Sequence, residues 1–355
     1  MRKTGMALAI RLAGRMLPAL AVVLLISIPL SASFLRAESL PAESSYAESL
    51  PSETLSAESS SAGSLPAESS SAESQSTESF STAGGTKEPP EEGTFRIQGE
   101  AVSLDESWQW ASNSAIHTGS AMLYRAPENE EKPRRNFTVC VNAGHGTFGG
   151  SEQQTLSHPD GTAKVTGGTN AEGTVWSTAI STGTVFLDGT DEASVSLEVA
   201  LDLKDRLLGD GYDVLMIRES DDVQLDNIAR TVIANNCADI HVAIHFDSTD
   251  YDKGVYFCSV PDDPSYRQME PVKSHWQEHM NLGKAIVRAM KGDGYALFGD
   301  GSLPMDLTQT SYSTIPSVDI ELGDTASGHS PQECEAWAQA LKDGIDLYFS
   351  GFPLS

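Results

Sequence analysis

The chain has 355 residues, of which 39% are hydrophobic and 21% are charged, so it can form one or two packed domains. Its 50 Asp and Glu residues outnumber its 23 Lys and Arg residues, and the formal net charge is -27 at pH 7. This acidity argues against a nucleic-acid partner, which requires a basic surface, and against electrostatic docking on anionic lipids.

The first 36 residues predict an export segment. Four basic residues precede residues 16–35, which carry no charge. The small residues Ser31, Ala32 and Ser33 favour cleavage as a signal peptide. The uncharged stretch is also long enough to span a bilayer, which makes a membrane anchor the alternative. Both alternatives predict an exported protein that is extracellular, associated with the cell wall or anchored in the membrane.

Residues 37–93 are a low-complexity Ser/Ala/Glu segment. Glutamate recurs at every fifth position from Glu38 to Glu58, and again from Glu68 to Glu78. A five-residue period keeps neither a helix face nor a strand face, and the segment has few large apolar residues to bury. We therefore predict a disordered spacer. Residues 94–135 follow no clear pattern, and we expect a partly ordered extension there.

Residues 136–355 alternate between predicted strands and predicted helices. The alternation predicts an α/β fold with a largely parallel twisted sheet and helices on both faces. The four cysteines form no C-x-x-C pair, and we expect mostly buried free thiols. The predicted strands are 137–141, 213–218, 239–245, 254–260 and 317–322, and the predicted helices are 193–208, 223–236, 269–290 and 331–349.

Three of the predicted strands carry metal-binding residue types. The first strand leads into Asn142 and His145, the third ends at His245, and the fifth contains Asp319 and Glu321. In parallel sheets, ligands bind outside the carboxyl ends of the strands. Two histidines and a carboxylate that meet there would form a zinc site with one open position.

These residues belong to a longer series of motifs. Residues 136–352 resemble the zinc-dependent N-acetylmuramoyl-L-alanine amidases, a family of bacterial cell-wall autolysins and sporulation hydrolases. A segment at 164–169 also resembles the insertion of clostridial members. Six motifs in the family's order carry the resemblance: Asn142-Ala-Gly-His-Gly146, Glu192-Ala-Ser-Val-Ser-Leu197, Gly211–Arg218, Arg230–Asp239, Ala243-Ile-His-Phe-Asp247 and Ile315–Glu321.

The resemblance implies a ligand set and a reaction. His145, Glu192 and His245 would be the zinc ligands, and Glu321 would be the catalytic carboxylate. The reaction would be hydrolysis of the amide that joins N-acetylmuramic acid to L-alanine in peptidoglycan. Zinc with three protein ligands lowers the pKa of its water to about 7. Glu198, six residues after Glu192 and within the predicted helix 193–208, is the rival ligand.

The sequence departs from the family pattern at two places. Asn142 stands where the family has Asp, which removes a carboxylate expected to orient His145. His245 is followed by Phe246 and Asp247 rather than by Ala and Asn. These departures leave a second hypothesis open, in which the protein binds peptidoglycan as a catalytically degenerate amidase.

Two further features have alternative interpretations. His275-Trp-Gln-Glu278-His279 matches the H-x-x-E-H pattern of inverted zincins, which makes a zinc peptidase a third hypothesis. We expect instead that this segment is the solvated face of a helix. Arg218 and Arg230 are interpreted as ion-pair partners at the sheet edge rather than as clamps for a substrate.

Overall fold

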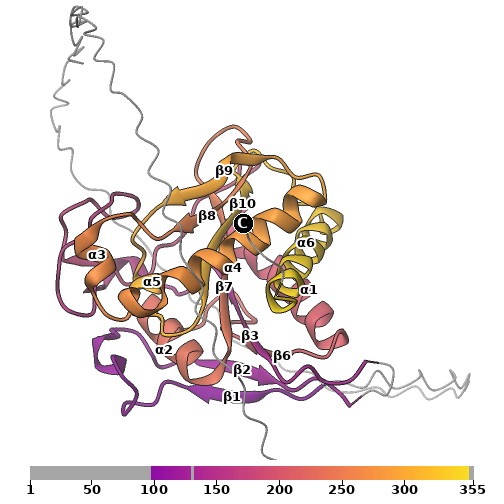
Figure 1. Cartoon of the computed structure of the whole chain (residues 1–355), viewed down its shortest axis with the longest axis horizontal. Helices are drawn as coiled ribbons and strands as arrows, with labels where there is room; N and C mark the ends of the chain where they lie inside the picture. The colour runs from indigo at the N-terminus through magenta and orange to yellow at the C-terminus, as the bar shows by residue number, and fades with distance from the viewer. Residues whose placement is uncertain (1–96, 129–131, 352–355) are drawn as a thin grey trace, which may run out of the picture. The chain divides into compact units, whose positions relative to one another are not determined.

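The computed structural model describes residues 97–128 and 132–351 (Figure 1). The predicted export segment and spacer lie outside these residues. No helix in the described part of the chain is long and apolar enough to cross a membrane. The chain divides into two units, Met1–Gly85 and Thr86–Ser355, and every element described below belongs to the second.

The fold is built on a mixed sheet of eight strands in the order β1-β2-β6-β3-β7-β10-β8-β9. The four central strands, β6, β3, β7 and β10, run parallel, which confirms the predicted parallel core. Both ends of the sheet include antiparallel pairs, so the whole sheet is mixed. The strands are β1 (Glu100–Ser103), β2 (Ser120–Tyr124), β3 (Thr138–Ala143), β6 (Asp213–Met216), β7 (Ile240–Asp247), β8 (Val255–Ser259), β9 (Leu297–Pro304) and β10 (Ser317–Asp324).

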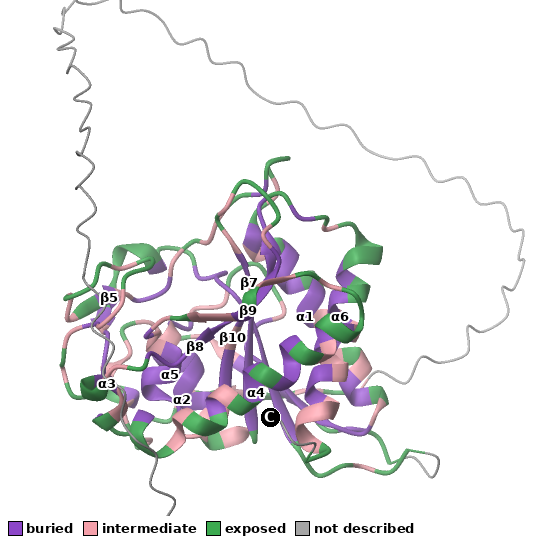
Figure 2. Cartoon of the chain, turned by 45° about the horizontal axis from the view of Figure 1, so that its top comes forward, coloured by how far each residue is buried: buried purple, intermediate pink, exposed green. Residues whose placement is uncertain are grey.

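Helices cover both faces of this sheet, as predicted. Helices α1 (Glu192–Gly209), α4 (Val272–Gly292) and α6 (Pro331–Phe349) pack against one face in a single apolar cluster. Helix α2 (Asn227–Cys237) packs on the opposite face, and α5 (Thr308–Tyr312) lies against it. Successive residues of a strand point to opposite faces, so β3 and β6 contribute apolar side chains to the cores on both faces. The central strands are accordingly buried (Figure 2).

Several helix boundaries follow from capping residues. Helix α6 begins as predicted, because Ser330 and Glu333 form a capping box and Pro331 occupies the first turn. Helix α2 begins at residue 227 rather than 223, because the Asp226 side chain caps it by accepting a hydrogen bond from the Ala229 amide at 2.8 Å. The predicted helix 269–290 is preceded by a separate short helix, α3 (Pro264–Gln268).

The long segment between β3 and α1, residues 147–191, forms a loop-rich insertion. It contains a small sheet made of β4 (Gln154–Leu156) and β5 (Trp176–Thr178). The buried Asp306 holds it in place, with its carboxylate 2.8 Å from Lys164 Nζ and 3.1 Å from His158 Nε2. The insertion thereby forms one wall of a cavity of about 590 Å³.

The four cysteines are free thiols. Cys140, Cys258 and Cys334 are buried and Cys237 is partly buried, which agrees with the expectation from the sequence.

Candidate metal and catalytic site

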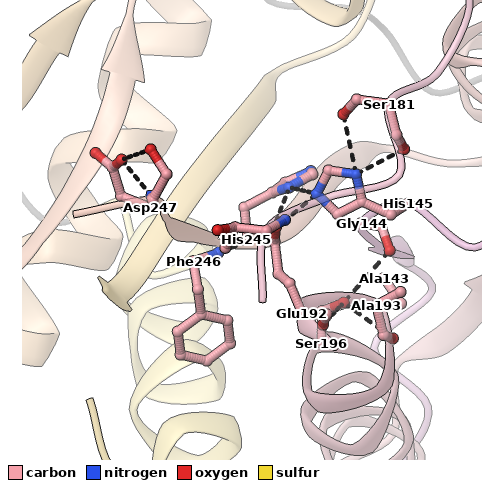
Figure 3. Close-up of polar contacts among 12 residues, drawn as sticks. Ala143, Gly144, His145, Ser181, Glu192, Ala193, Ser196, His245, Phe246 and Asp247 are labelled. Carbon is pink, nitrogen blue, oxygen red and sulfur yellow. Dashed lines mark hydrogen bonds and ion pairs between the residues drawn. The ribbon is translucent and has the colours of Figure 1, made fainter. Parts of the chain in front are cut away.

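Three side chains from separate elements meet at the carboxyl edge of the sheet (Figure 3). His145 follows β3, Glu192 is the first residue of α1, and His245 lies near the end of β7. Glu192 Oε1 lies 2.8 Å from His145 Nε2 and 3.1 Å from His245 Nδ1, and the two histidine nitrogens are 3.0 Å apart. The structure therefore brings together the three residues that the sequence singled out as ligands.

Two glycines permit this close approach. An added Cβ on Gly144 would lie 2.4 Å from the ring of His245. Gly183 has a φ of +88°, and a Cβ there would lie 2.8 Å from the ring of His145 and 2.9 Å from Glu192 Oε2. These distances are too short for any larger residue, so glycine is required at both positions.

Two buried arginines hold the backbone that presents His145. Arg230 donates to the carbonyls of Ala143 and His145, and Arg218 donates to those of Ala143 and Gly144. His145 itself has a left-handed φ of +61°, a conformation that such contacts stabilise. The expectation of ion pairs was wrong, since neither arginine forms a salt bridge with a carboxylate of the described residues. Burial instead directs their N–H groups to backbone oxygens.

The insertion positions the His145 ring. The Nδ1–H of His145 donates to the backbone carbonyl of Ser181 at 2.9 Å, which leaves Nε2 facing the other two ligand candidates (Figure 3). The insertion also contributes the amide of Thr184, which donates to Glu192 Oε2 at 2.8 Å. No motif indicates these partners, because backbone groups of a loop carry no residue-type signal.

The two departures from the family pattern lie away from the three ligand candidates. Asn142 accepts a hydrogen bond from Arg230 at 3.0 Å, and its Nδ2 lies 3.1 Å from Nε2 of the buried His241. Asn142 itself forms no hydrogen bond with the His145 side chain, and the orienting role expected of an Asp at this position stays a prediction. Asp247 accepts hydrogen bonds from Tyr256 and Lys253 and secures the loop after β7.

Two carboxylates of β10 lie next to His245. Glu321 is paired with His245 in the parallel register of β10 and β7. The Oε2 atom of Glu321 is buried and has no hydrogen-bond partner among the described residues. Asp319, two residues earlier, places Oδ2 3.6 Å from His245 Nε2. Together with Cys258, these carboxylates form a second group whose potential ligand atoms all lie within 4.8 Å of one another.

Burial and mutual repulsion set the charge state of the site. Burial and the neighbouring Asp319 raise the pKa of Glu321 well above its usual range. Burial lowers the pKa of His245, but Asp319 and Glu192 outweigh it and raise that pKa to about 10. In Glu192, burial is opposed by both histidines, which hold its pKa below the usual range. Carboxylates outnumber imidazoles in this site, so a cation bound there would be stabilised.

The rival motifs do not form such a site. Glu198 is exposed on α1, whereas Glu192 is 3% exposed and points into the cluster. The prediction that the segment around His275 and His279 faces solvent was wrong for His279, which is buried and only 2% exposed. Its Nδ1 accepts a hydrogen bond from the Ser317 amide at 3.0 Å, so that nitrogen is not available to a metal ion.

Comparisons with known proteins identify the family. A family model described as N-acetylmuramoyl-L-alanine amidase matches residues 139–346, more than half of the chain. The chain therefore belongs to the N-acetylmuramoyl-L-alanine amidase family, as the sequence motifs predicted. No curated protein matches the chain.

Solved structures of similar fold include three amidases. Ami1 from Mycobacterium abscessus is 21% identical with a TM-score of 0.49, and the match covers 60% of this chain and 99% of that one. Ami1 from Mycobacterium smegmatis is 19% identical with a TM-score of 0.48, and the match covers 61% of this chain and 97% of that one. The CwlD amidase from Clostridioides difficile was solved in complex with the GerS lipoprotein. It is 20% identical with a TM-score of 0.42, and the match covers 61% of this chain and 99% of that one.

Proposed function

We propose that this protein is a zinc-dependent N-acetylmuramoyl-L-alanine amidase that hydrolyses the amide between N-acetylmuramic acid and L-alanine in peptidoglycan. The observation that carries the proposal is the cluster of His145, Glu192 and His245. Its three donor atoms lie within 3.1 Å of one another. The neighbouring Glu321 has an Oε2 atom with no hydrogen-bond partner in the described part of the chain.

The donor set fits zinc. Two imidazole nitrogens and one carboxylate oxygen form a ligand set that occurs in catalytic zinc sites, and zinc bonds to such atoms are about 2.0–2.2 Å long. One ion can therefore contact His145 Nε2, Glu192 Oε1 and His245 Nδ1 at once. All three residues line the 590 Å³ cavity, which leaves a side open to substrate. Zinc held there would supply a Lewis acid that acidifies water and polarises the scissile carbonyl.

Glu321 is proposed as the general base and then the general acid. Its carboxylate accepts a proton from the attacking water as the water adds to the amide carbonyl. It then donates that proton to the departing amino group of L-alanine, which frees the stem peptide from the sugar. Burial and the neighbouring Asp319 raise the pKa of Glu321, which favours the proton-bound form that donates to the leaving amine.

The cavity suits a neutral polar substrate. Hydroxyl and amide side chains from the insertion and from α5 dominate the wall beyond the ligand cluster, and they include Thr169, Asn170, Thr182, Thr308 and Gln309. Such groups can hydrogen-bond the amides and hydroxyls of a sugar-linked peptide. The proposal includes export by residues 1–36 and the role of residues 37–93 as a spacer, because peptidoglycan lies outside the cytoplasmic membrane.

The degenerate-amidase hypothesis is less well supported. Its motivation was Asn142 and Asp247, but neither side chain forms a hydrogen bond with the three ligand candidates. The proposed catalytic carboxylate, Glu321, is present beside them.

Digestion of purified sacculi tests the proposed activity. The wild-type protein should bind one zinc ion per chain and release new L-alanine amino groups, whereas Glu321→Gln should keep the zinc and lose release by at least about 100-fold. Glu198→Gln is the matched control and should behave as wild type. Zinc binding without amino-group release would favour the binding protein instead. A wild-type level of release by Glu321→Gln would refute the role of that carboxylate.

A further inference from the structure

Asp319 is a partly buried carboxylate to which the proposed reaction assigns no role. It lies on β10 two residues before Glu321, so both side chains project from the same face of the sheet. Its side chain is 13% exposed, and its Oδ1 atom has no hydrogen-bond partner among the described residues. A carboxylate oxygen that is buried without a hydrogen bond is costly, so the position of Oδ1 calls for an explanation.

The orientation of His245 supplies that explanation. Its Nδ1 atom is the nitrogen that faces the ligand cluster, 3.0 Å from His145 Nε2 and 3.1 Å from Glu192 Oε1. Its Nε2 atom points away from the cluster and lies 3.6 Å from Asp319 Oδ2. Asp319 therefore lies behind the imidazole ring, on the side opposite to the position a metal ion would occupy.

A metal ligand must offer a lone pair, so His245 must carry its proton on Nε2 if Nδ1 binds the ion. We infer that Asp319 is a positioning residue that accepts the Nε2–H of His245 and holds the ring with Nδ1 toward the metal. This inference rests on the zinc site of the proposed function. Carboxylates that orient zinc-binding histidines in this way raise metal affinity.

The two histidines of the site are thus held by different partners. His145 donates its outer N–H to the neutral carbonyl of Ser181, on the insertion. In the inferred arrangement His245 donates to a carboxylate on a central strand, and a hydrogen bond to an ionised carboxylate is about twice as strong as one between neutral groups. Asp319 consequently has a larger expected effect on zinc affinity than a partner on the loop.

Zinc affinity measured on the purified full chain tests this inference. Zinc dissociation constants would be measured by competition with a chromophoric chelator, and the melting temperature of the metal-free protein would be measured in parallel. Asp319→Leu should raise the zinc Kd by about 10–100-fold. Asp319→Asn should raise it by about 3–10-fold, because the amide oxygen still accepts the hydrogen bond but carries no charge.

Asp324→Asn is the matched control. Asp324 is a buried carboxylate on the same strand that accepts a hydrogen bond from the Lys253 amide at 2.9 Å, away from His245. Its substitution should lower the melting temperature while the zinc Kd stays within about twofold of wild type. A merely structural role for Asp319 would give the same result as this control.

Each outcome decides the inference. A wild-type Kd in Asp319→Leu overturns it, as does an equal loss of affinity in Asp319→Asn and Asp319→Leu, because charge alone would then account for the effect. If Asp319→Leu does not fold, a wild-type Kd in Asp319→Asn overturns the inference. A wild-type protein that binds no zinc overturns the proposed function as well, whereas a zinc-binding, active wild type with an unaffected Asp319→Leu refutes only the role of Asp319.

Discussion

Replacing Gly144 with alanine should displace His245 and weaken metal binding. The added Cβ would lie 2.4 Å from Cε1, 2.6 Å from Nδ1 and 2.8 Å from Nε2 of that ring. The backbone at Gly144 cannot retreat easily, because its amide donates to the Ile244 carbonyl at 3.0 Å and its carbonyl accepts from Arg218 at 2.7 Å. The ring must therefore move.

The size of the effect follows from these distances. Carbon atoms pack favourably at about 3.5–4.0 Å, so the ring must shift by about 1 Å. Such a shift is large against the tolerance of about 0.5 Å for an organised site, and we expect the zinc Kd to rise about tenfold or more. Overpacking costs about 1–3 kcal/mol, which corresponds to a fall in melting temperature of about 2–12 °C for a domain of this size.

Chelator competition and thermal unfolding measure both effects. Gly209→Ala is the control, because nothing lies within 4 Å of its added Cβ at the end of α1. This variant should keep the wild-type zinc affinity and gain up to about 1 kcal/mol of stability. The reasoning fails if Gly144→Ala binds zinc as tightly as the wild type does.

Further predictions concern Glu192 on α1, the buried His279, and the insertion. Glu192→Gln should weaken zinc binding about 100-fold by metal titration, whereas the exposed Glu198→Gln should leave it unchanged. Burial lowers the pKa of His279 to about 3. As the pH falls, the unfolded chain therefore binds a proton at this histidine before the folded chain does. The free energy of unfolding should therefore fall below about pH 6.5, by up to about 1.4 kcal/mol per pH unit, and His279→Asn should flatten this slope in denaturant titrations at pH 5 and pH 7. Asp306→Asn should lower stability by about 3–5 kcal/mol, because it removes the charge that pairs with the buried Lys164, and limited proteolysis should show earlier cleavage of the insertion. An unchanged cleavage pattern would contradict that role.

The sequence was sufficient to predict that His145, Glu192 and His245 lie close together, for a simple physical reason. Parallel strands end at a common edge, so residues that follow β3 and end β7 must lie near each other. Strong apolar runs identified these strands, and the family motifs selected Glu192 from the neighbouring Glu198. Hydrophobic pattern and residue type thus carry most of the information about this site.

The remaining contacts depend on three-dimensional packing that local pattern does not encode. Strand β9 contains two glycines, Gly299 and Gly301, with positive φ, and its pattern therefore does not resemble that of a strand. The hydrogen bond of His145 to the Ser181 carbonyl joins residues 36 positions apart through a backbone atom. His279 was predicted to be solvated because it lies in a polar segment, yet α4 turns that side chain toward β10.

Anomalous diffraction at the zinc absorption edge, from crystals of the zinc-loaded protein, would locate the metal ion itself. We expect one peak about 2.0–2.2 Å from His145 Nε2, Glu192 Oε1 and His245 Nδ1. A peak between Cys258, Asp319 and Glu321 instead, or zinc-loaded crystals with no peak beside His145, would contradict it.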